Sequence, residues 1–154
     1  MIELHAFTEK EFIPFSLRSV REYATNMTRS GDWDAAAALS DATDLFQRLL
    51  PAGLHTPGHH FFAIRNQATS EFLGDAWILM DRLQKSAFIY DLHILPHRRN
   101  QGHASHALHA IETFARAQGL SVIQLHVFGH NQAAQKLYGK LGFTASRITM
   151  VKNL

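Results

Sequence analysis

The sequence predicts a mixed α/β fold in a single domain that spans residues 1–154. Two observations carry this prediction. Between residues 60 and 94, three short apolar runs are joined by short polar connections, which is typical of an antiparallel meander. Between residues 87 and 128, a strand pattern, an amphipathic helix and a second strand pattern follow one another, which indicates a βαβ unit with two parallel strands.

The N-terminal half begins with a strand pattern over residues 2–7. Thr8 and Glu11 then match a capping box, although Pro14 allows a helix start nearer to itself. A second helix is expected over residues 34–50, because its apolar residues recur on one face, and Pro51 ends it. After a turn-rich loop, the three meander strands are expected at 60–65, 72–80 and 87–94.

The C-terminal half contains the clearest helical periodicity, over residues 102–118. A buried-looking strand is expected at 121–128. Asn131 can cap a further helix that Gly142 closes, and a last strand is expected at 143–151. The predicted order is therefore β-α-α-β-β-β-α-β-α-β.

Composition excludes several function classes. The chain has no cysteine, which rules out disulfides, thiolate metal sites and a cysteine nucleophile. Its net charge of +2 and its single short basic cluster do not suit nucleic-acid binding. No apolar run is long enough to span a membrane, and residues 1–5 do not resemble a secretory signal, so a cytoplasmic protein is expected.

The junction between residues 94 and 105 has the composition of an anion-binding site. A strand ends there and a strong helix begins at Gly102. A helix N-terminus offers free N–H groups and about half a positive charge. Gly102 and the small Ala104 let a large anion approach the backbone, and Arg98 or Arg99 supplies a fixed positive charge. The spacing matches neither the dinucleotide fingerprint nor a P-loop.

Two motifs give the sequence a resemblance to a known family. The residues Arg99-x-x-Gly102-x-Ala104 resemble the Gln/Arg-x-x-Gly-x-Gly/Ala motif of the GCN5-related N-acetyltransferases, the GNAT superfamily. The stretch 125–143, with Asn131, Ala134, Leu137-Tyr138 and Gly142-Phe143, looks like the C-terminal motif of the same superfamily. Residues 49–60 and 87–91 also look like a group of small bacterial members.

This resemblance implies an acetyl-CoA site between two parallel strands that splay apart, in a mostly antiparallel sheet with flanking helices. It implies that Leu92, His93 and Ile94 pair with the pantetheine arm and that the Ile94 N–H polarises the thioester carbonyl. Asn131 would contact the pantetheine arm or the adenosine side. The pyrophosphate would be bound by Arg99 and by the six residues Asn100, Gln101, Gly102, His103, Ala104 and Ser105. Asn100, Gln101 and His103 depart from the commonest family residues, which affects the expected affinity rather than the expected binding.

The resemblance also implies an acetyl-CoA-dependent N-acyltransferase that acts by direct attack of an amine in a ternary complex. Tyr138 would be the general acid that protonates the leaving thiolate. Asp91, on the strand expected to face the substrate, is the candidate base, because a protonated amine must lose a proton before it attacks. A structural role remains the alternative for each: a carboxylate that holds neighbouring backbone for Asp91, and a core aromatic for Tyr138. The acceptor is expected to be a small-molecule or peptide amine, and the resemblance allows for a homodimer.

Two other function classes stay open at this point. A non-catalytic acyl-CoA-binding regulatory module on the same fold would need the loop at Gly102 but neither Asp91 nor Tyr138. A metal-binding protein would use some of the 11 histidines. His103, His106 and His109 lie along one helix beside its apolar face, and His59 and His60 point to opposite sides of a strand, so no metal site is expected.

Overall fold

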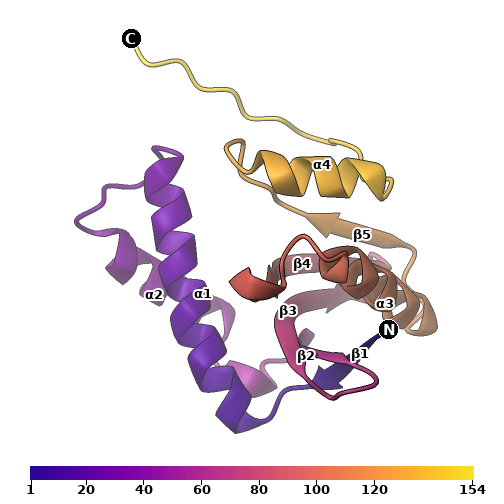
Figure 1. Cartoon of the computed structure of the whole chain (residues 1–154). Helices are drawn as coiled ribbons and strands as arrows, with labels where there is room; N and C mark the ends of the chain where they lie inside the picture. The colour runs from indigo at the N-terminus through magenta and orange to yellow at the C-terminus, as the bar shows by residue number, and fades with distance from the viewer.

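The computed structural model describes all 154 residues (Figure 1). Its helices and strands, in chain order, are β1 (Ile2–Ala6), α1 (Glu9–Arg29), α2 (Ala38–Leu49), η1 (Gly53–His55), β2 (His59–Asn66), β3 (Phe72–Asp81), β4 (Ser86–Ile94), η2 (Pro96–Arg98), α3 (His103–Ala117), β5 (Val122–Leu125) and α4 (Gln132–Lys140). No helix is both long and apolar enough to cross a membrane.

The five strands form one sheet in the order β1-β2-β3-β4-β5. The pairs β1–β2, β2–β3 and β3–β4 are antiparallel, and β4 pairs with β5 in parallel. The mixed α/β class, the antiparallel meander and the single parallel pair are therefore confirmed.

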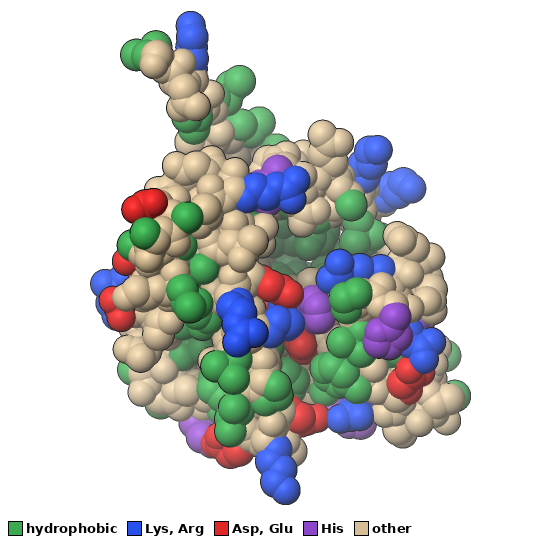
Figure 2. Space-filling view, turned by 60° about the vertical axis from the view of Figure 1, so that its left-hand side comes forward, with side chains coloured by type: hydrophobic (Ala, Val, Ile, Leu, Met, Phe, Trp, Pro, Cys, Tyr) green, Lys and Arg blue, Asp and Glu red, His purple; other side chains and the backbone are tan.

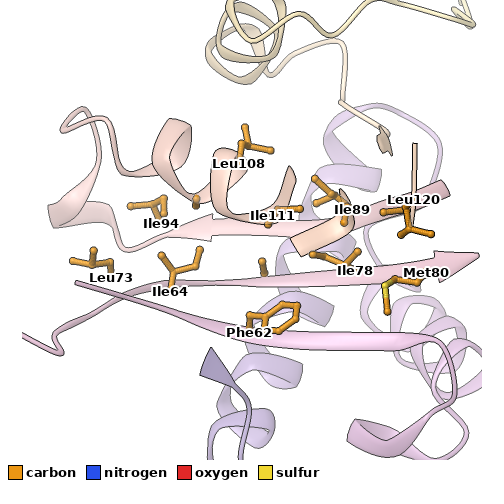
Figure 3. Packing of buried hydrophobic residues seen from close by; sticks show 14 residues of the cluster. Phe62, Ile64, Leu73, Ile78, Met80, Ile89, Ile94, Leu108, Ile111 and Leu120 are labelled. Atoms are coloured by element: carbon orange, nitrogen blue, oxygen red, sulfur yellow. The ribbon is translucent and has the colours of Figure 1, made fainter. Parts of the chain in front are cut away.

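Helices cover both faces of the sheet (Figure 1). On one face, α3 buries Leu108 and Ile111 against the strands, in a cluster of 14 buried residues that Figure 3 shows. On the other face, α1 and α2 pack through a second cluster that is rich in aromatic side chains and includes Phe15, Phe46 and Trp77. The ends of β4 and β5 where the two strands separate lie between α1–α2 and α4.

Both predicted helix caps are present. The Thr8 side chain accepts a hydrogen bond from the Glu11 N–H, while the Glu11 carboxylate accepts one from the Thr8 N–H. The helix therefore begins at Glu9, and the alternative start near Pro14 is wrong. At α4, the Asn131 Oδ1 accepts a hydrogen bond from the Ala134 N–H at 3.1 Å.

The predicted last strand at 143–151 is not formed. Residues 143–154 contain no helix or strand, and in Figure 1 they run away from the sheet. The strand pattern is present in the sequence, but a strand also needs a neighbour for its hydrogen bonds, and β5 stays at the sheet edge. Two other expected elements are shorter than predicted: the second helix begins at Ala38 rather than near 34, and β5 ends at Leu125 rather than near 128.

Candidate active site

The parallel pair separates halfway along β4. The register runs from Ser86 opposite Val122 to Ile89 opposite Leu125, and there it ends. From Tyr90 to Ile94, β4 keeps only its antiparallel partner β3. A strand with one neighbour leaves half of its N–H and C=O groups unpaired, so this part of β4 has one open edge.

The alternation of the strand places particular backbone groups on that open edge. The Leu95 N–H donates to the Leu73 carbonyl of β3, at 2.9 Å. N–H groups alternate sides along a strand. The backbone N–H of His93 therefore also points to β3, whereas the N–H groups of Leu92 and Ile94 point to the open side. The Ile94 carbonyl agrees with this, because it accepts a hydrogen bond from Arg99 Nε at 3.0 Å.

A β-bulge brings two adjacent side chains to the same face. The register of β3 and β4 shifts between Trp77 and Ile78, so that Tyr90 is the extra residue between Ile89 and Asp91. Tyr90 stacks on Trp77 with ring centroids 4.4 Å apart. Asp91 accepts a hydrogen bond from Ser19 of α1 at 2.9 Å. Both side chains therefore face α1 and α2, which a regular strand would not permit.

The loop after β4 presents a run of free backbone amides. No N–H group from Asn100 to Ser105 donates to another group of the chain, and α3 has no side-chain cap. Asn100 and Gly102 have positive φ angles of 60° and 80°, which turn successive amides in a way that suits an anion. The N-terminus of the 15-residue helix α3 adds its dipole at the same place.

The two candidate arginines have different roles in this loop. Arg98 forms an ion pair with Glu71 and is half-buried, so its charge is already balanced. Arg99 is exposed, holds the Ile94 carbonyl through Nε and has no carboxylate partner. Arg99 is therefore the arginine whose charge is available to a bound anion.

A cleft of about 370 Å³ lies where β4 and β5 separate. Figure 2 shows one face of the molecule hollowed, with hydrophobic side chains inside the hollow. The cleft is lined by 19 residues from α1, α2, β3, β4, β5, the loop that follows β5, and α4. Asp91, Leu92, Asn131 and Tyr138 are among them, so the two predicted catalytic residues share one cavity.

A cluster of charged side chains surrounds the Asp91 carboxylate. Arg18 of α1 lies 3.1 Å from Asp91, 2.5 Å from Asp75 and 2.7 Å from Glu22. Burial raises the pKa of Asp91; Arg18 opposes this, and the charges of Asp75 and Glu22 raise it further. A carboxylate whose pKa is raised toward neutral is better suited to accept a proton than an ordinary aspartate.

His93 completes the cluster from β4. Its Nδ1 lies 3.8 Å from Asp75 and its Nε2 lies 4.0 Å from Glu22. Neither distance is a hydrogen bond, and Nδ1 is buried without a partner. The His93 side chain therefore belongs to the α1 face of β4, although its backbone lies on the segment predicted to bind pantetheine.

Tyr138 enters the cleft from α4. Burial raises the pKa of its phenol, and the charge of Asp91 raises it further, so the hydroxyl stays protonated at neutral pH. Tyr138 also packs against Phe143, with ring centroids 5.5 Å apart. Asn131 uses Oδ1 to cap α4 and still lines the cleft, so capping and ligand contact are compatible.

Other predicted positions lie outside the cleft lining. The open edge at Ile94 and the loop Arg99–Ser105 continue along the chain from the cleft rather than forming its wall. Two histidines after β5 lie at the cleft: His126 lines it, and His130 lies 3.1 Å from the Asn26 side chain of α1. No group of three or more histidine, aspartate or glutamate side chains is placed to hold a metal ion.

Sequence reasoning missed the contribution of α1. Arg18 and Ser19 belong to no motif in the sequence. The Glu22 carboxylate could attract a cationic amine, but an exposed helix carboxylate is the commoner explanation from sequence. Ser19, Glu22, Tyr23 and Asn26 all line the cleft. Their spacing of three and four residues places them on one helix face, which was the signal available in the sequence.

Comparison with known proteins agrees with this geometry. The model of the acetyltransferase (GNAT) family matches residues 23–143. The uncharacterised N-acetyltransferases YycN and YdgE of Bacillus subtilis (strain 168) are 34% and 35% identical to this chain, over 99% and 98% of it and 99% and 97% of their own lengths.

Solved structures extend the similarity to the fold. The crystal structure of YycN superimposes with a TM-score of 0.95, covering 100% of this chain and 99% of that one. A putative acetyltransferase from Pyrococcus furiosus, 26% identical, gives a TM-score of 0.71 with both chains fully covered. The match of the family model and the full-length similarity to YycN and YdgE establish that this chain belongs to the GNAT family of acetyltransferases.

Proposed function

We propose that this protein transfers an acetyl group from acetyl-CoA to the amine of a small molecule or peptide. The observation that carries the proposal is the cleft at the separation of β4 and β5, which Asp91 and Tyr138 both line. Family membership supports the acyl transfer, and the free amides of residues 100–105 suit a pyrophosphate.

The residues would divide the work of binding as follows. The unpaired backbone groups of Leu92 and Ile94 would hold the pantetheine arm as an added strand. The loop from Asn100 to Ser105, with Arg99 beside it, would bind the pyrophosphate. Acetyl-CoA would supply the activated thioester, and the Ile94 N–H would polarise its carbonyl as a hydrogen-bond donor.

The catalytic step needs a base, an acid and no protein nucleophile. Asp91 would accept the proton of the bound ammonium, directly or through water, and leave a neutral amine. The amine nitrogen would bond to the acetyl carbon as the carbon–sulfur bond breaks. Tyr138 would give its proton to the departing sulfur, and the second proton released by the amine nitrogen would restore the phenol.

A non-catalytic acyl-CoA-binding module is the second candidate. It would require the loop at Gly102 but would place no demand on the cleft residues. The raised pKa values of Asp91 and Tyr138, each in the direction that its catalytic role needs, favour the enzyme. Release of CoA that accelerates when amines are added would exclude the module.

Titration calorimetry with acetyl-CoA tests the proposal. Binding in the micromolar range is expected, and an absence of binding at high micromolar acetyl-CoA would remove its main support. The matched variant Tyr138→Phe keeps the ring and removes the acid. It should lower kcat by about 10²-fold or more while leaving the Kd for acetyl-CoA unchanged. Unchanged turnover would take Tyr138 out of the acid role.

A further inference from the structure

The α1–α2 side of the cleft is walled mainly by aromatic rings. Trp77 stacks on Tyr90 at 4.4 Å between centroids and lies 5.2 Å from Phe46. Tyr23 lies 6.1 Å from Phe46 and 6.4 Å from Phe128, so the rings form a continuous lining. Such a wall suits a flat apolar body, because ring-to-ring contacts add to the burial of apolar area.

The charges that line the cleft have one sign. Glu22 and Asp91 contribute carboxylates, and no lysine or arginine is among the 19 lining residues. Arg18 lies outside the lining and bonds to Glu22, Asp75 and Asp91 together. One guanidinium against three carboxylates leaves a formal charge of −2. Glu22 and Asp91 lie together at Arg18, so this charge favours an additional cation at one place in the cleft.

This arrangement selects among amines. An amino acid would bring a carboxylate next to Glu22 and Asp91 with no cation in the lining to pair with it. A polyamine would have to place its second ammonium away from Glu22 and Asp91, which lie together at Arg18, against a wall that offers no further carboxylate. An aminoglycoside would bury hydroxyl groups against rings. A single ammonium on an apolar body avoids each of these costs.

We propose that the acceptor is a primary arylalkylamine, bound with its ammonium at Glu22 and Asp91 and its ring against the aromatic wall. The inference rests on the proposed function, because it assigns the acceptor of that same cleft. It goes further in stating which amines are accepted and which are refused.

Binding of the amine can be followed without turnover. Trp33 and Trp77 are the two tryptophans, and Trp77 lines the cleft, so Trp33→Phe leaves one reporter. In this variant, 2-phenylethylamine should change the fluorescence of Trp77 with a Kd at least about tenfold lower than that of phenylalanine or spermidine. Equal affinities, or tighter binding of phenylalanine or spermidine, would overturn the inference.

Turnover and a matched pair of variants complete the test. With acetyl-CoA, kcat/KM should be highest for 2-phenylethylamine. Glu22→Gln should raise the KM for this amine about tenfold and leave the Kd for acetyl-CoA unchanged. Glu112→Gln, an equivalent change on α3 outside the cleft, should alter neither. If acetyl-CoA binds and another amine class is preferred, only the inference fails; if acetyl-CoA does not bind, the proposed function fails with it.

Discussion

At the scale of single residues, a close approach of two strand backbones requires glycine at position 74. A Cβ atom at this position would lie 2.0 Å from the carbonyl oxygen of His93, and backbone cannot turn aside as a side chain can. Gly74 also precedes Asp75 and faces Ile94, so the close pairing of β3 and β4 there supports the charged cluster.

Gly74→Ala is therefore expected to lower the free energy of unfolding by about 1–3 kcal/mol, because the strands must separate to admit the methyl group. Denaturant unfolding measures the loss. Gly139→Ala is the matched control, since nothing lies within 4 Å of its Cβ position in α4, and there alanine should stabilise by about 0.5–1 kcal/mol. Equal effects of the two substitutions would contradict the argument.

Asp91 gives a prediction that depends on pH. As a base it must be deprotonated, and burial raises its pKa, so the acid limb of kcat/KM should lie above the usual range of an aspartate. Asp91→Asn should lower kcat/KM by about 10²-fold or more and remove that limb. The Kd for acetyl-CoA should not change.

The same shift predicts a change in stability with a definite sign. A carboxyl group whose pKa is raised by folding stabilises the folded state below its unfolded pKa, and this stabilisation is lost as the pH rises through the folded pKa. The wild type should therefore lose Tm relative to Asp91→Asn across this interval. A constant difference in Tm from pH 4 to pH 8 would show that the pKa of Asp91 is not raised.

The sequence was informative for residues that belong to local motifs. Thr8 and Asn131 cap their helices, and Gly102 has the positive φ that a glycine allows, because each signal lies within a few residues of its effect. Arg18 was missed for the opposite reason. Its partners Asp75 and Asp91 are 57 and 73 residues away, and only the folded sheet brings them to α1.

At the scale of elements, the two ends of α3 differ in their proposed roles but share one backbone feature. Gly102 before the helix has φ 80° and Gly119 after it has φ 78°. Neither position is sterically crowded, so alanine would meet only the strain of the left-handed conformation. That strain costs about 1–2 kcal/mol per residue for an L-amino acid.

Gly102→Ala and Gly119→Ala should consequently lose similar amounts of unfolding free energy. Only Gly102→Ala should weaken acetyl-CoA binding, because relief of the strain rotates the amides that would meet the pyrophosphate. Calorimetry on the two variants and the wild type makes the comparison. Equal losses of affinity would mean that the start of α3 does not bind the pyrophosphate.

The separation of β4 from β5 shows what element-scale prediction can and cannot supply. Strand and helix order were enough to expect a parallel pair, and the family resemblance implied that the two strands separate. The bulge at Tyr90 was not predictable from the pattern of the strand. The residues from Ala87 to Ile94 have the mostly apolar pattern of a regular strand that is buried on both faces. The bulge nevertheless decides that Tyr90 and Asp91 both face α1 and α2.

At the scale of the whole molecule, the cleft joins two parts of the chain that otherwise touch little. One wall comes from α1 and α2, and the other from β5, the loop after it and α4. Direct contacts across it include the His130 side chain with Asn26 at 3.1 Å and the Phe128 ring with Tyr23. A ligand in the cleft would add contacts to both walls at once.

Acetyl-CoA should therefore stabilise the protein as a whole. At a concentration 100 times its Kd, a ligand that binds only the folded state contributes about 2.7 kcal/mol. For a chain of this size, that corresponds to a rise in Tm of about 5–10 °C. Hydrogen exchange should slow at three separate places, namely the open edge of β4, the amides of residues 100–105 and the start of α4. Protection at residues 100–105 alone would indicate that the pyrophosphate binds but the thioester does not enter the cleft, and then Asp91 and Tyr138 would not meet it.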